Sequence, residues 1–313
     1  MDVRHSVIMP TGRRSAERAA AFQWEDGGVT ASEPTQDRVE PPVLDHVPDI
    51  RLIACDMDGT LLDDDLIHDE FWPLIQTLHD RHVVFCPASG RQYFNLLERF
   101  EPIADDVIFI AENGTLVMRG GQELSSDCLE PAVVHELVRI ARGLVSGGAD
   151  VGAVLCGKNS AYIERADEAF RDEVDKYYHR LQVVDDLMAV EDDILKVAIY
   201  DFESSERVSA PAFAHLRDTH QVVVSGEHWL DVMDLHANKG AGIRHIQDAL
   251  GITADQTMVF GDFLNDLEMM DEATYSFAMA NAHPELAARA RYRAPGNTDN
   301  GVVRTIRSIL RLP

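Results

Sequence analysis

The sequence predicts an α/β protein built on a doubly wound parallel sheet, with a second and smaller α/β module inserted into it. Three observations support this fold class. Short apolar strands alternate with amphipathic helices after residue 50 and again after residue 238. Conspicuous polar motifs follow directly after several of these strands. Between the two alternating segments the pattern is still α/β but less regular. We therefore expect residues 49–120 and 230–313 to form a core domain and residues 121–229 to form an inserted domain.

Residues 1–48 are expected to form a disordered extension. The stretch is rich in proline, glycine, serine, threonine and charged residues, and it shows no sustained helical or strand period. Such a composition offers too little apolar surface to outweigh the entropy lost when a chain becomes ordered. The start of the chain also lacks the apolar stretch of a secretory signal, so we expect a cytoplasmic protein.

The first core segment begins with a short buried strand, RLIAC, at 51–55. The next segment, 68–82, has apolar residues at helical spacing and is predicted to be a helix. Its apolar face consists of Phe71, Leu74, Ile75 and Leu78. The remaining elements of this segment are a strand over 83–89, a helix over 91–100 and a strand over 106–114.

The inserted segment is predicted to contain two helices and several strands. The helices cover 131–145 and 167–181. The strands cover 150–156, 160–165, 195–202 and 220–226. We expect these elements to form a separate small α/β domain, because they follow a different and less regular order than the core.

The second core segment opens with a helix over 239–251 that turns Ile243, Ile246 and Leu250 inward and stops at Gly251. It continues with a strand over 257–261, a helix over 265–273, a strand over 275–280 and a helix over 302–312. Short apolar strands between helices predict a parallel sheet that is covered on both faces. In such sheets, ligands bind at the carboxyl ends of the strands.

Composition excludes two classes of partner. The net charge of -26 argues against a nucleic-acid partner, which requires basic patches. The chain has no apolar stretch near the roughly 20 residues of a membrane span, so we expect no membrane partner.

Polar residues gather at the predicted carboxyl ends of the core strands. In chain order they are Asp56, Asp58, Ser89, Gly90, Arg91, Asn113, Asp262, Asn265 and Asp266, and Lys239 opens a core helix. Because the ends of parallel strands meet at one edge, we expect these residues to converge although they span more than two hundred positions. Carboxylates that lie this close together repel one another unless a hard cation neutralises them. Oxygen ligands without histidine or cysteine favour Mg²⁺.

This combination of groups suits phosphoryl transfer. A carboxylate beside a metal, a hydroxyl, a lysine and backbone N–H groups makes a phosphate site. An aspartate there can attack phosphorus and form an aspartyl-phosphate that water then hydrolyses. A second carboxyl two residues later lies on the same side of an extended strand, where it could protonate the leaving oxygen.

The motifs DxDGTLL, SGR, ENG, KG and GDxxND, in this order, resemble the haloacid dehalogenase superfamily. The long insert resembles the Cof-like branch with its α/β cap (the C2B type), and the resemblance covers residues 49–313. It implies a Rossmann-like core. It also implies the following roles: Asp56 as nucleophile, Asp58 as acid and base, Ser89, Gly90, Lys239 and Asn265 as phosphate ligands, and Asp56, the Asp58 carbonyl, Asp262 and Asp266 around Mg²⁺. Phe263 departs from the smaller or polar residues usual in the last motif.

Several residues keep two interpretations. Arg91 could bind substrate or pair with a structural carboxylate, and Asn113 could touch substrate or cap backbone. We expect Asp63, Asp64 and Asp65 to form a solvated turn rather than part of the site. Lys196 is expected to be structural.

The sequence therefore predicts a Mg²⁺-dependent phosphatase that hydrolyses a small phosphorylated metabolite through an aspartyl-phosphate. The metabolite could be a sugar phosphate or a phosphorylated cofactor. A phosphomutase and a metabolite-binding module with retired chemistry are the alternatives. We expect the protein to be a monomer or a weak homodimer.

Overall fold

The computed structural model describes residues 39–313, and most of the expected extension (1–38) lies outside the described residues. The segment that follows lies along the last helix, α9 (Gly301–Leu310). Glu40 pairs with Arg304 at 2.6 Å, and the carbonyl of Pro42 accepts a hydrogen bond from Ser308. These contacts tie the beginning of the described chain to its end.

The predicted doubly wound parallel sheet is confirmed. The core is an eight-stranded sheet in the order β16-β15-β14-β1-β4-β5-β6-β7. Neighbouring strands are parallel from β16 to β5, and β6 and β7 add an antiparallel hairpin at the edge. In chain order the strands are β1 (Leu52–Asp56), β4 (Val84–Ala88), β5 (Ile108–Ala111), β6 (Leu116–Arg119), β7 (Gln122–Ser126), β14 (Thr257–Gly261), β15 (Tyr275–Met279) and β16 (Tyr292–Ala294).

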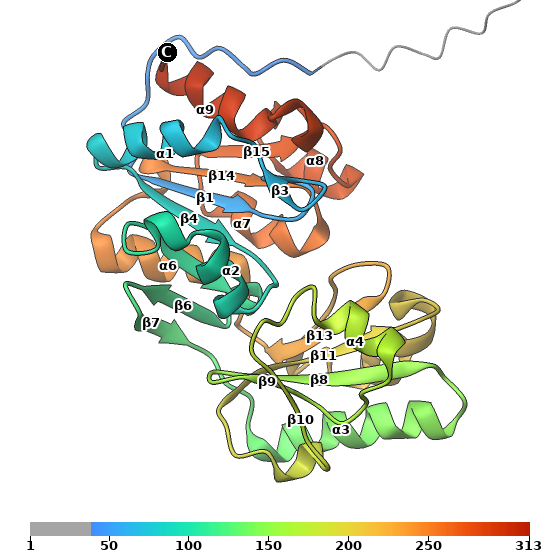
Figure 1. Ribbon diagram of the computed structural model, residues 1–313. Coiled ribbons are helices and arrows are strands. Elements are labelled where there is room, and N and C mark those ends of the chain that lie inside the picture. The colour runs from blue at the N-terminus through green and yellow to red at the C-terminus, as the bar shows by residue number, and fades with distance from the viewer. Residues whose placement is uncertain (1–38) are drawn as a thin grey trace, which may run out of the picture. The chain divides into compact units, whose positions relative to one another are not determined.

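Helices cover both faces of this sheet, because successive strand residues point to opposite sides. Ile53 and Cys55 of β1 join one apolar cluster with α1 and α9, whereas Leu52 and Ala54 join a second cluster with α6 and α7. Figure 1 shows α1 and α9 on one side of the strands and α6 and α7 on the other. The core helices are α1 (Phe71–Asp80), α2 (Tyr93–Arg99), α6 (Lys239–Leu250), α7 (Leu267–Asp271), α8 (Pro284–Arg289) and α9.

The inserted segment forms its own six-stranded sheet in the order β10-β9-β8-β11-β13-β12. Its strands are β8 (Val151–Gly157), β9 (Ala161–Ile163), β10 (Leu181–Val183), β11 (Ile194–Asp201), β12 (His220–Val224) and β13 (Trp229–Asp234). Helix α3 (Pro131–Ser146) covers the face turned away from the core (Figure 1). Helices α4 (Glu168–Val174) and α5 (Ala210–Phe213) complete this cap.

Strand alternation decides which cap residues face the core. Val197 and Ile199 of β11 belong to the apolar cluster beneath α3. Lys196 and Tyr200 therefore point to the opposite face, toward the core. On the neighbouring strand β13, Asp231 lies opposite Ala198 in the antiparallel register and shares that face.

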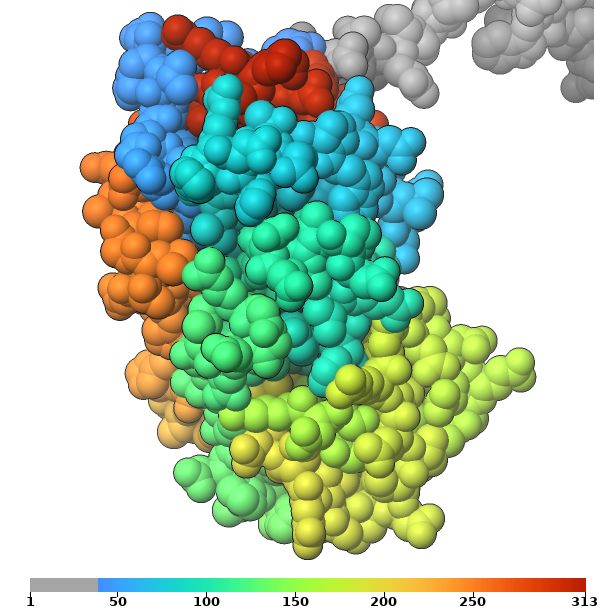
Figure 2. Space-filling model, turned by 60° about the vertical axis from the view of Figure 1, so that its left-hand side comes forward, coloured from blue at the N-terminus to red at the C-terminus, as the bar shows by residue number. Residues whose placement is uncertain are grey.

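The core and the cap touch near α2. Gln92 accepts a hydrogen bond from the backbone N–H of Arg180 and donates one to its carbonyl, both at 2.9 Å. Figure 2 shows this part of the core, in teal, resting on the yellow-green cap.

The predicted helix over 167–181 is wrong in its second half, since α4 ends at Val174. The carbonyl of Lys176 accepts hydrogen bonds from Arg91 and Asn95 instead of continuing the helical pattern. Tertiary contacts with the core thus replace the last helical turns.

Several short elements were not predicted: β6, β7, β10, β13, β16 and the small hairpin of β2 (Leu62–Asp63) and β3 (Leu66–Ile67). Short single-turn helices join the longer elements. They are η1 (Glu101–Ile103), η2 (Glu112–Gly114), η3 (Leu187–Ala189), η4 (Ser205–Ser209), η5 (Ala214–Leu216), η6 (Ala254–Gln256), η7 (Leu264–Asp266) and η8 (Asn297–Asp299).

Since β7 pairs in the core sheet and β13 in the cap sheet, we propose that the cap runs from 127 to 234, slightly later at both ends than 121–229. Among the described residues, no helix is both long and apolar enough to cross a membrane.

Candidate active site

Three charged side chains meet at the carboxyl edge of the core sheet. Asp56 ends β1, Lys239 begins α6, and Asp266 ends the short helix η7. The Lys239 ammonium Nζ lies 2.5 Å from Asp56 Oδ1 and 2.6 Å from Asp266 Oδ1, and all three side chains are buried. Asp56 and Lys239 are 183 positions apart in the chain, so the parallel sheet brings them together as the sequence predicts.

Asp262 completes this group of carboxylates. Its Oδ1 accepts a hydrogen bond from the Thr60 hydroxyl at 2.9 Å. Its backbone N–H donates to Asp266 Oδ2 at 3.0 Å, which braces the loop after β14. A glycine is required at position 59, because φ is +77° there and a Cβ would lie 2.4 Å from Asp262 Oδ2.

The site holds more negative charge than its lysine neutralises. Oxygen atoms of Asp56, Asp262 and Asp266 all lie within 4.8 Å of one another, and they face one ammonium, that of Lys239. Burial, together with the charge of Asp266, raises the pKa of Asp56 well above its usual range. The same two causes raise the pKa of Asp262 to about 6. Burial alone would lower the pKa of Lys239, but the charges of Asp266 and Asp56 outweigh it and raise that pKa.

This arrangement fits a divalent cation. The donor atoms are carboxylate oxygens, which hard cations prefer, and the excess negative charge is what such a cation would neutralise. Asp266 has both oxygens engaged, one by Lys239 and the other by the backbone N–H groups of Asp262 and Phe263, and these contacts fix the loop after β14. The Asp cluster could therefore bind a divalent metal ion.

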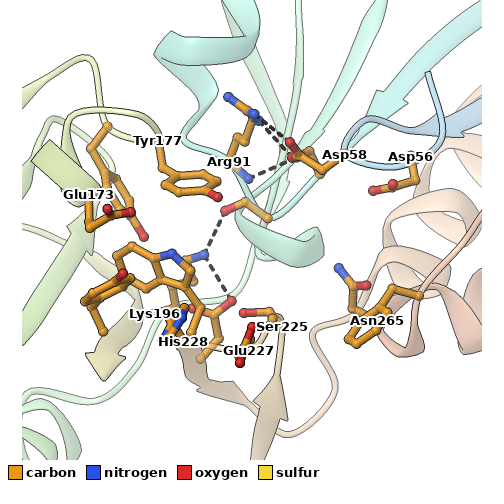
Figure 3. Close-up of a pocket in the computed structure, with 18 of the residues that line it drawn as sticks. Asp56, Asp58, Arg91, Glu173, Tyr177, Lys196, Ser225, Glu227, His228 and Asn265 are labelled. Atoms are coloured by element: carbon orange, nitrogen blue, oxygen red, sulfur yellow. Dashed lines mark hydrogen bonds and ion pairs between the residues drawn. The ribbon is translucent and has the colours of Figure 1, made fainter. Parts of the chain in front are cut away.

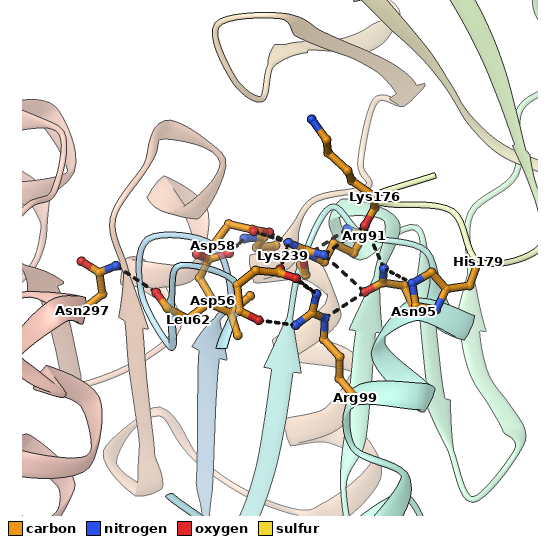
Figure 4. A network of polar contacts seen from close by, with 12 residues as sticks. Asp56, Asp58, Leu62, Arg91, Asn95, Arg99, Lys176, His179, Lys239 and Asn297 are labelled. Carbon is orange, nitrogen blue, oxygen red and sulfur yellow. Dashed lines mark hydrogen bonds and ion pairs between the residues drawn. The ribbon is translucent and has the colours of Figure 1, made fainter. Parts of the chain in front are cut away.

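Asp58 points away from this cluster toward Arg91. Arg91 donates to Asp58 through Nε at 2.8 Å and through its terminal nitrogen at 2.5 Å, a two-pronged pair (Figure 4). The same guanidinium contacts Asp65 at 2.9 Å, and Arg99 also binds Asp65. The Asp58 side chain remains 50% exposed, whereas that of Arg91 is buried. Arg91 thus pairs with Asp58, the predicted acid and base, and it also lines the cavity, so both of its interpretations stay open. Asp65 is more than a solvated turn residue, because two arginines bind it.

The remaining predicted residues separate into two groups. Ser89, Gly90 and Asn265 line the cavity in front of Asp56 together with Phe263. Asn113 lies behind them: its amide donates to Asp231 Oδ2 at 2.6 Å, and its oxygen accepts from Asn265 at 3.1 Å. Asn113 thus links a cap residue to a residue at the cavity.

The cavity lies between the core motifs and the cap and encloses about 370 Å³. That volume is in the range of sites for small metabolites. Figure 3 shows Asp56, Asp58 and Asn265 on one side of it, with Glu173, Tyr177 and the segment from Ser225 to His228 on the other. The sequence pattern did not indicate these cap residues, because no motif marks them.

A buried cluster of charges joins the cap to the core beside this cavity. Lys196 Nζ donates to the Gly90 carbonyl at 2.8 Å and lies 3.0 Å from Glu112 and 3.3 Å from Asp231. Burial alone would lower the pKa of Lys196, but the two carboxylates raise it. Burial raises the pKa of Glu112, although Lys196 opposes that rise. Lys196 was predicted to be structural, and the structure places it against the loop that carries the predicted phosphate ligands.

Comparisons with known proteins identify the family of this chain. The sequence model of the haloacid dehalogenase-like hydrolase family matches residues 53–306. The chain is 35% identical over 271 residues to the 5-amino-6-(5-phospho-D-ribitylamino)uracil phosphatase YbjI of Escherichia coli strain K12, covering 84% of this chain and 97% of the relative. It is 28% identical to the HMP-PP phosphatase of Cronobacter sakazakii, covering 76% of this chain and 87% of the relative.

A solved structure shares the fold across almost its whole length. The crystal structure of SMU.1108c from Streptococcus mutans UA159 superposes with a TM-score of 0.77 at 25% identity, covering 84% of this chain and 99% of that one. The family model, the curated relatives and the fold all lead to the same assignment. The chain belongs to the haloacid dehalogenase-like hydrolases, and it is a phosphoric monoester hydrolase of the phosphatase type.

Proposed function

We propose that the protein is a Mg²⁺-dependent phosphatase that hydrolyses a small phosphorylated metabolite through an aspartyl-phosphate on Asp56. The observation that carries this proposal is the buried ion pair between Lys239 and Asp56, of which Asp56 lines the cavity, with the half-exposed Asp58 two residues away. Lys239 holds Asp56 Oδ1, which leaves the second oxygen of that carboxylate as the nucleophile.

The reaction then has two steps. In the first, the Asp56 oxygen forms a bond to phosphorus, the bond from phosphorus to the leaving oxygen breaks, and Asp58 gives that oxygen a proton. In the second, Asp58 takes a proton from water, which attacks the same phosphorus and releases inorganic phosphate and the Asp56 carboxylate. The two-pronged pair with Arg91 holds the Asp58 carboxyl at the cavity, and about half of that side chain stays exposed.

Other side chains bind and orient the phosphoryl group. Ser89 and Asn265 line the cavity and can donate hydrogen bonds to its oxygens, and Lys239 offsets its charge. Asp56, Asp262 and the Asp58 carbonyl would hold the Mg²⁺ ion, with Asp266 bracing them. When bound, the ion would supply positive charge to the carboxylates and to the phosphate oxygens.

The curated relatives suggest the first substrate to test. They include a 5-amino-6-(5-phospho-D-ribitylamino)uracil phosphatase and an HMP-PP phosphatase. We take the ribitylaminouracil phosphate as the candidate because that relative shares the higher identity and almost its full length with this chain.

The test is a phosphate-release assay over a panel of phosphorylated metabolites with Mg²⁺, on wild type, Asp56→Asn and the control Asp64→Asn. Asp64 is exposed in the same acidic stretch and has a positive φ that asparagine tolerates, so its variant should behave as wild type. Asp56→Asn should keep less than about a tenth of kcat, a loss of more than ~1.4 kcal/mol of transition-state stabilisation. A higher residual rate would contradict the covalent mechanism. Isomer formation without phosphate release would support a phosphomutase instead, and binding without turnover a retired module.

A further inference from the structure

The cap wall of the cavity is built from aromatic side chains. Trp229 makes edge-to-face contacts with Tyr177, Tyr178 and Tyr200, at centroid distances of 5.5, 6.2 and 4.9 Å. All four line the cavity, and Tyr177 and Trp229 remain partly exposed to it. Aromatic faces of this kind favour a flat, apolar partner.

Hydrogen-bond acceptors stand beside these rings. His228 Nδ1 lies 2.8 Å from the carbonyl oxygen of Asp201, which can only accept, so the neutral imidazole carries its proton on Nδ1. Its other nitrogen, Nε2, is then an acceptor. Glu227 lines the same wall, and its carboxylate makes no hydrogen bond or ion pair within residues 39–313. A ligand with N–H donors would satisfy both groups.

Among residues 39–313, the cap wall offers no free positive charge. Within the described chain, the cations that line the cavity are Arg91 and Lys196. Arg91 is committed to Asp58 and Asp65, and Lys196 to Gly90, Glu112 and Asp231. A second anionic group on the substrate would therefore meet carboxylates without a compensating cation.

We infer that the cap wall binds the leaving group of the substrate and that this group carries an uncharged, flat heteroaromatic ring with N–H donors. Trp229 and Tyr177 hold the ring, and Glu227 and His228 accept its hydrogen bonds. This inference rests on the proposed phosphatase function and adds the residues that select the substrate. Ring recognition by the wall is independent of the phosphoryl chemistry at Asp56, so the two can fail separately.

A matched pair of substrates separates ring recognition from phosphate chemistry. The compound 5-amino-6-(5-phospho-D-ribitylamino)uracil and ribitol 5-phosphate share the phosphoester and the polyol chain, but only the first carries a ring. The ratio of their kcat/KM values measures recognition of the ring alone. We expect wild type to favour the ring-bearing ester by about a hundredfold or more, as for a stacked ring with one or two hydrogen bonds to charged or polar groups.

Glu227→Ala and Trp229→Leu should each reduce this ratio by about tenfold or more. The control is Glu206→Ala, which removes the same charge from an exposed cap position that does not line the cavity, and it should keep the wild-type ratio. Urea unfolding of Trp229→Leu checks that its cap is folded, and Glu227 is exposed enough for its variant to fold. A wild-type ratio near one, or an unchanged ratio in both variants, would overturn the inference while leaving the phosphatase function intact. Failure to hydrolyse either ester or any member of the wider panel would instead contradict the phosphatase function.

Discussion

Replacing Lys196 by methionine would remove the one ammonium in the buried cluster that joins the cap to the core. Methionine has a similar length, so the change deletes charge and hydrogen bonds with little loss of volume. It would leave Glu112 and Asp231 facing each other without a cation, since both lie within 3.3 Å of Lys196 Nζ. It would also leave the Gly90 carbonyl without its donor.

The expected loss of stability follows from burial. The side chains of Lys196 and Glu112 are 2% and 1% exposed. Removing one partner of such a buried pair typically costs about 3–5 kcal/mol, because the remaining charge is uncompensated. Lys176→Met is the matched control, since Lys176 is 57% exposed and pairs with Glu173 only at the surface. That control should lose less than about 1 kcal/mol.

Urea unfolding, followed by far-UV circular dichroism, measures both variants against wild type. Lys196→Met should lower the urea concentration at the midpoint of unfolding clearly more than Lys176→Met does. The dependence of the free energy of unfolding on urea concentration should be similar in both variants. Equal midpoints for the two variants would refute the reasoning, because the cluster would then contribute no more than a surface pair.

The loss of unfolding free energy in Lys196→Met should also depend on pH. Burial raises the pKa of Glu112, and Lys196 opposes that rise, so the pKa should climb further in the variant. A carboxyl whose pKa is raised on folding stabilises the protein below its unfolded pKa, and that stability is lost as the pH rises through the folded pKa. The stability difference from wild type should therefore shrink as the pH falls from neutral through the raised pKa of Glu112. A constant difference would show that Glu112 does not take up the missing charge.

Three further predictions concern the chemistry. Asp58→Ala should lower kcat/KM, which reports the first step, more for a sugar phosphate than for p-nitrophenyl phosphate, because only a basic leaving oxygen needs a proton. Equal losses of kcat/KM would remove Asp58 from the acid role. Asp262→Asn should raise the Mg²⁺ concentration needed for half-maximal activity by about tenfold or more. Ca²⁺ should not replace Mg²⁺, because Ca²⁺ takes more ligands at longer distances. Full activity in the presence of a chelator would contradict the metal assignment. Fructose 1,6-bisphosphate should have a kcat/KM about tenfold or more below that of fructose 6-phosphate, since its second phosphate meets Glu227 and Asp231 without a free cation, and equal values would show that the cap wall tolerates anions.

The core was predictable because its pattern is local. Each parallel strand is a short apolar run with a polar motif at its end, and the sheet geometry then brings those motifs to one edge. This reasoning placed Asp56, Lys239 and Asp262 together, and the structure finds them so. Their catalytic roles stay predictions.

The cap side of the site could not be predicted in the same way. Lys196 and Asp231 are isolated polar residues on apolar strands, which indicates a polar face but not what that face meets. The early end of α4 has the same cause, because the carbonyl of Lys176 bonds to side chains of the distant core rather than to its own helix. Long-range pairing of this kind leaves no periodic signal in the sequence.

The central claim is that Asp56 carries the phosphoryl group, and trapping that intermediate tests it most directly. Asp58→Ala should accumulate the intermediate with p-nitrophenyl phosphate, because the first step needs no proton on the leaving oxygen and the second lacks its base. Borohydride reduces an acyl phosphate to an alcohol, so a trapped Asp56 becomes homoserine, which mass spectrometry of the peptide from this segment detects. We predict homoserine at position 56, dependent on substrate and Mg²⁺, together with a burst of one p-nitrophenolate per active site. A burst without modification of Asp56, or with modification at another residue, would contradict the account.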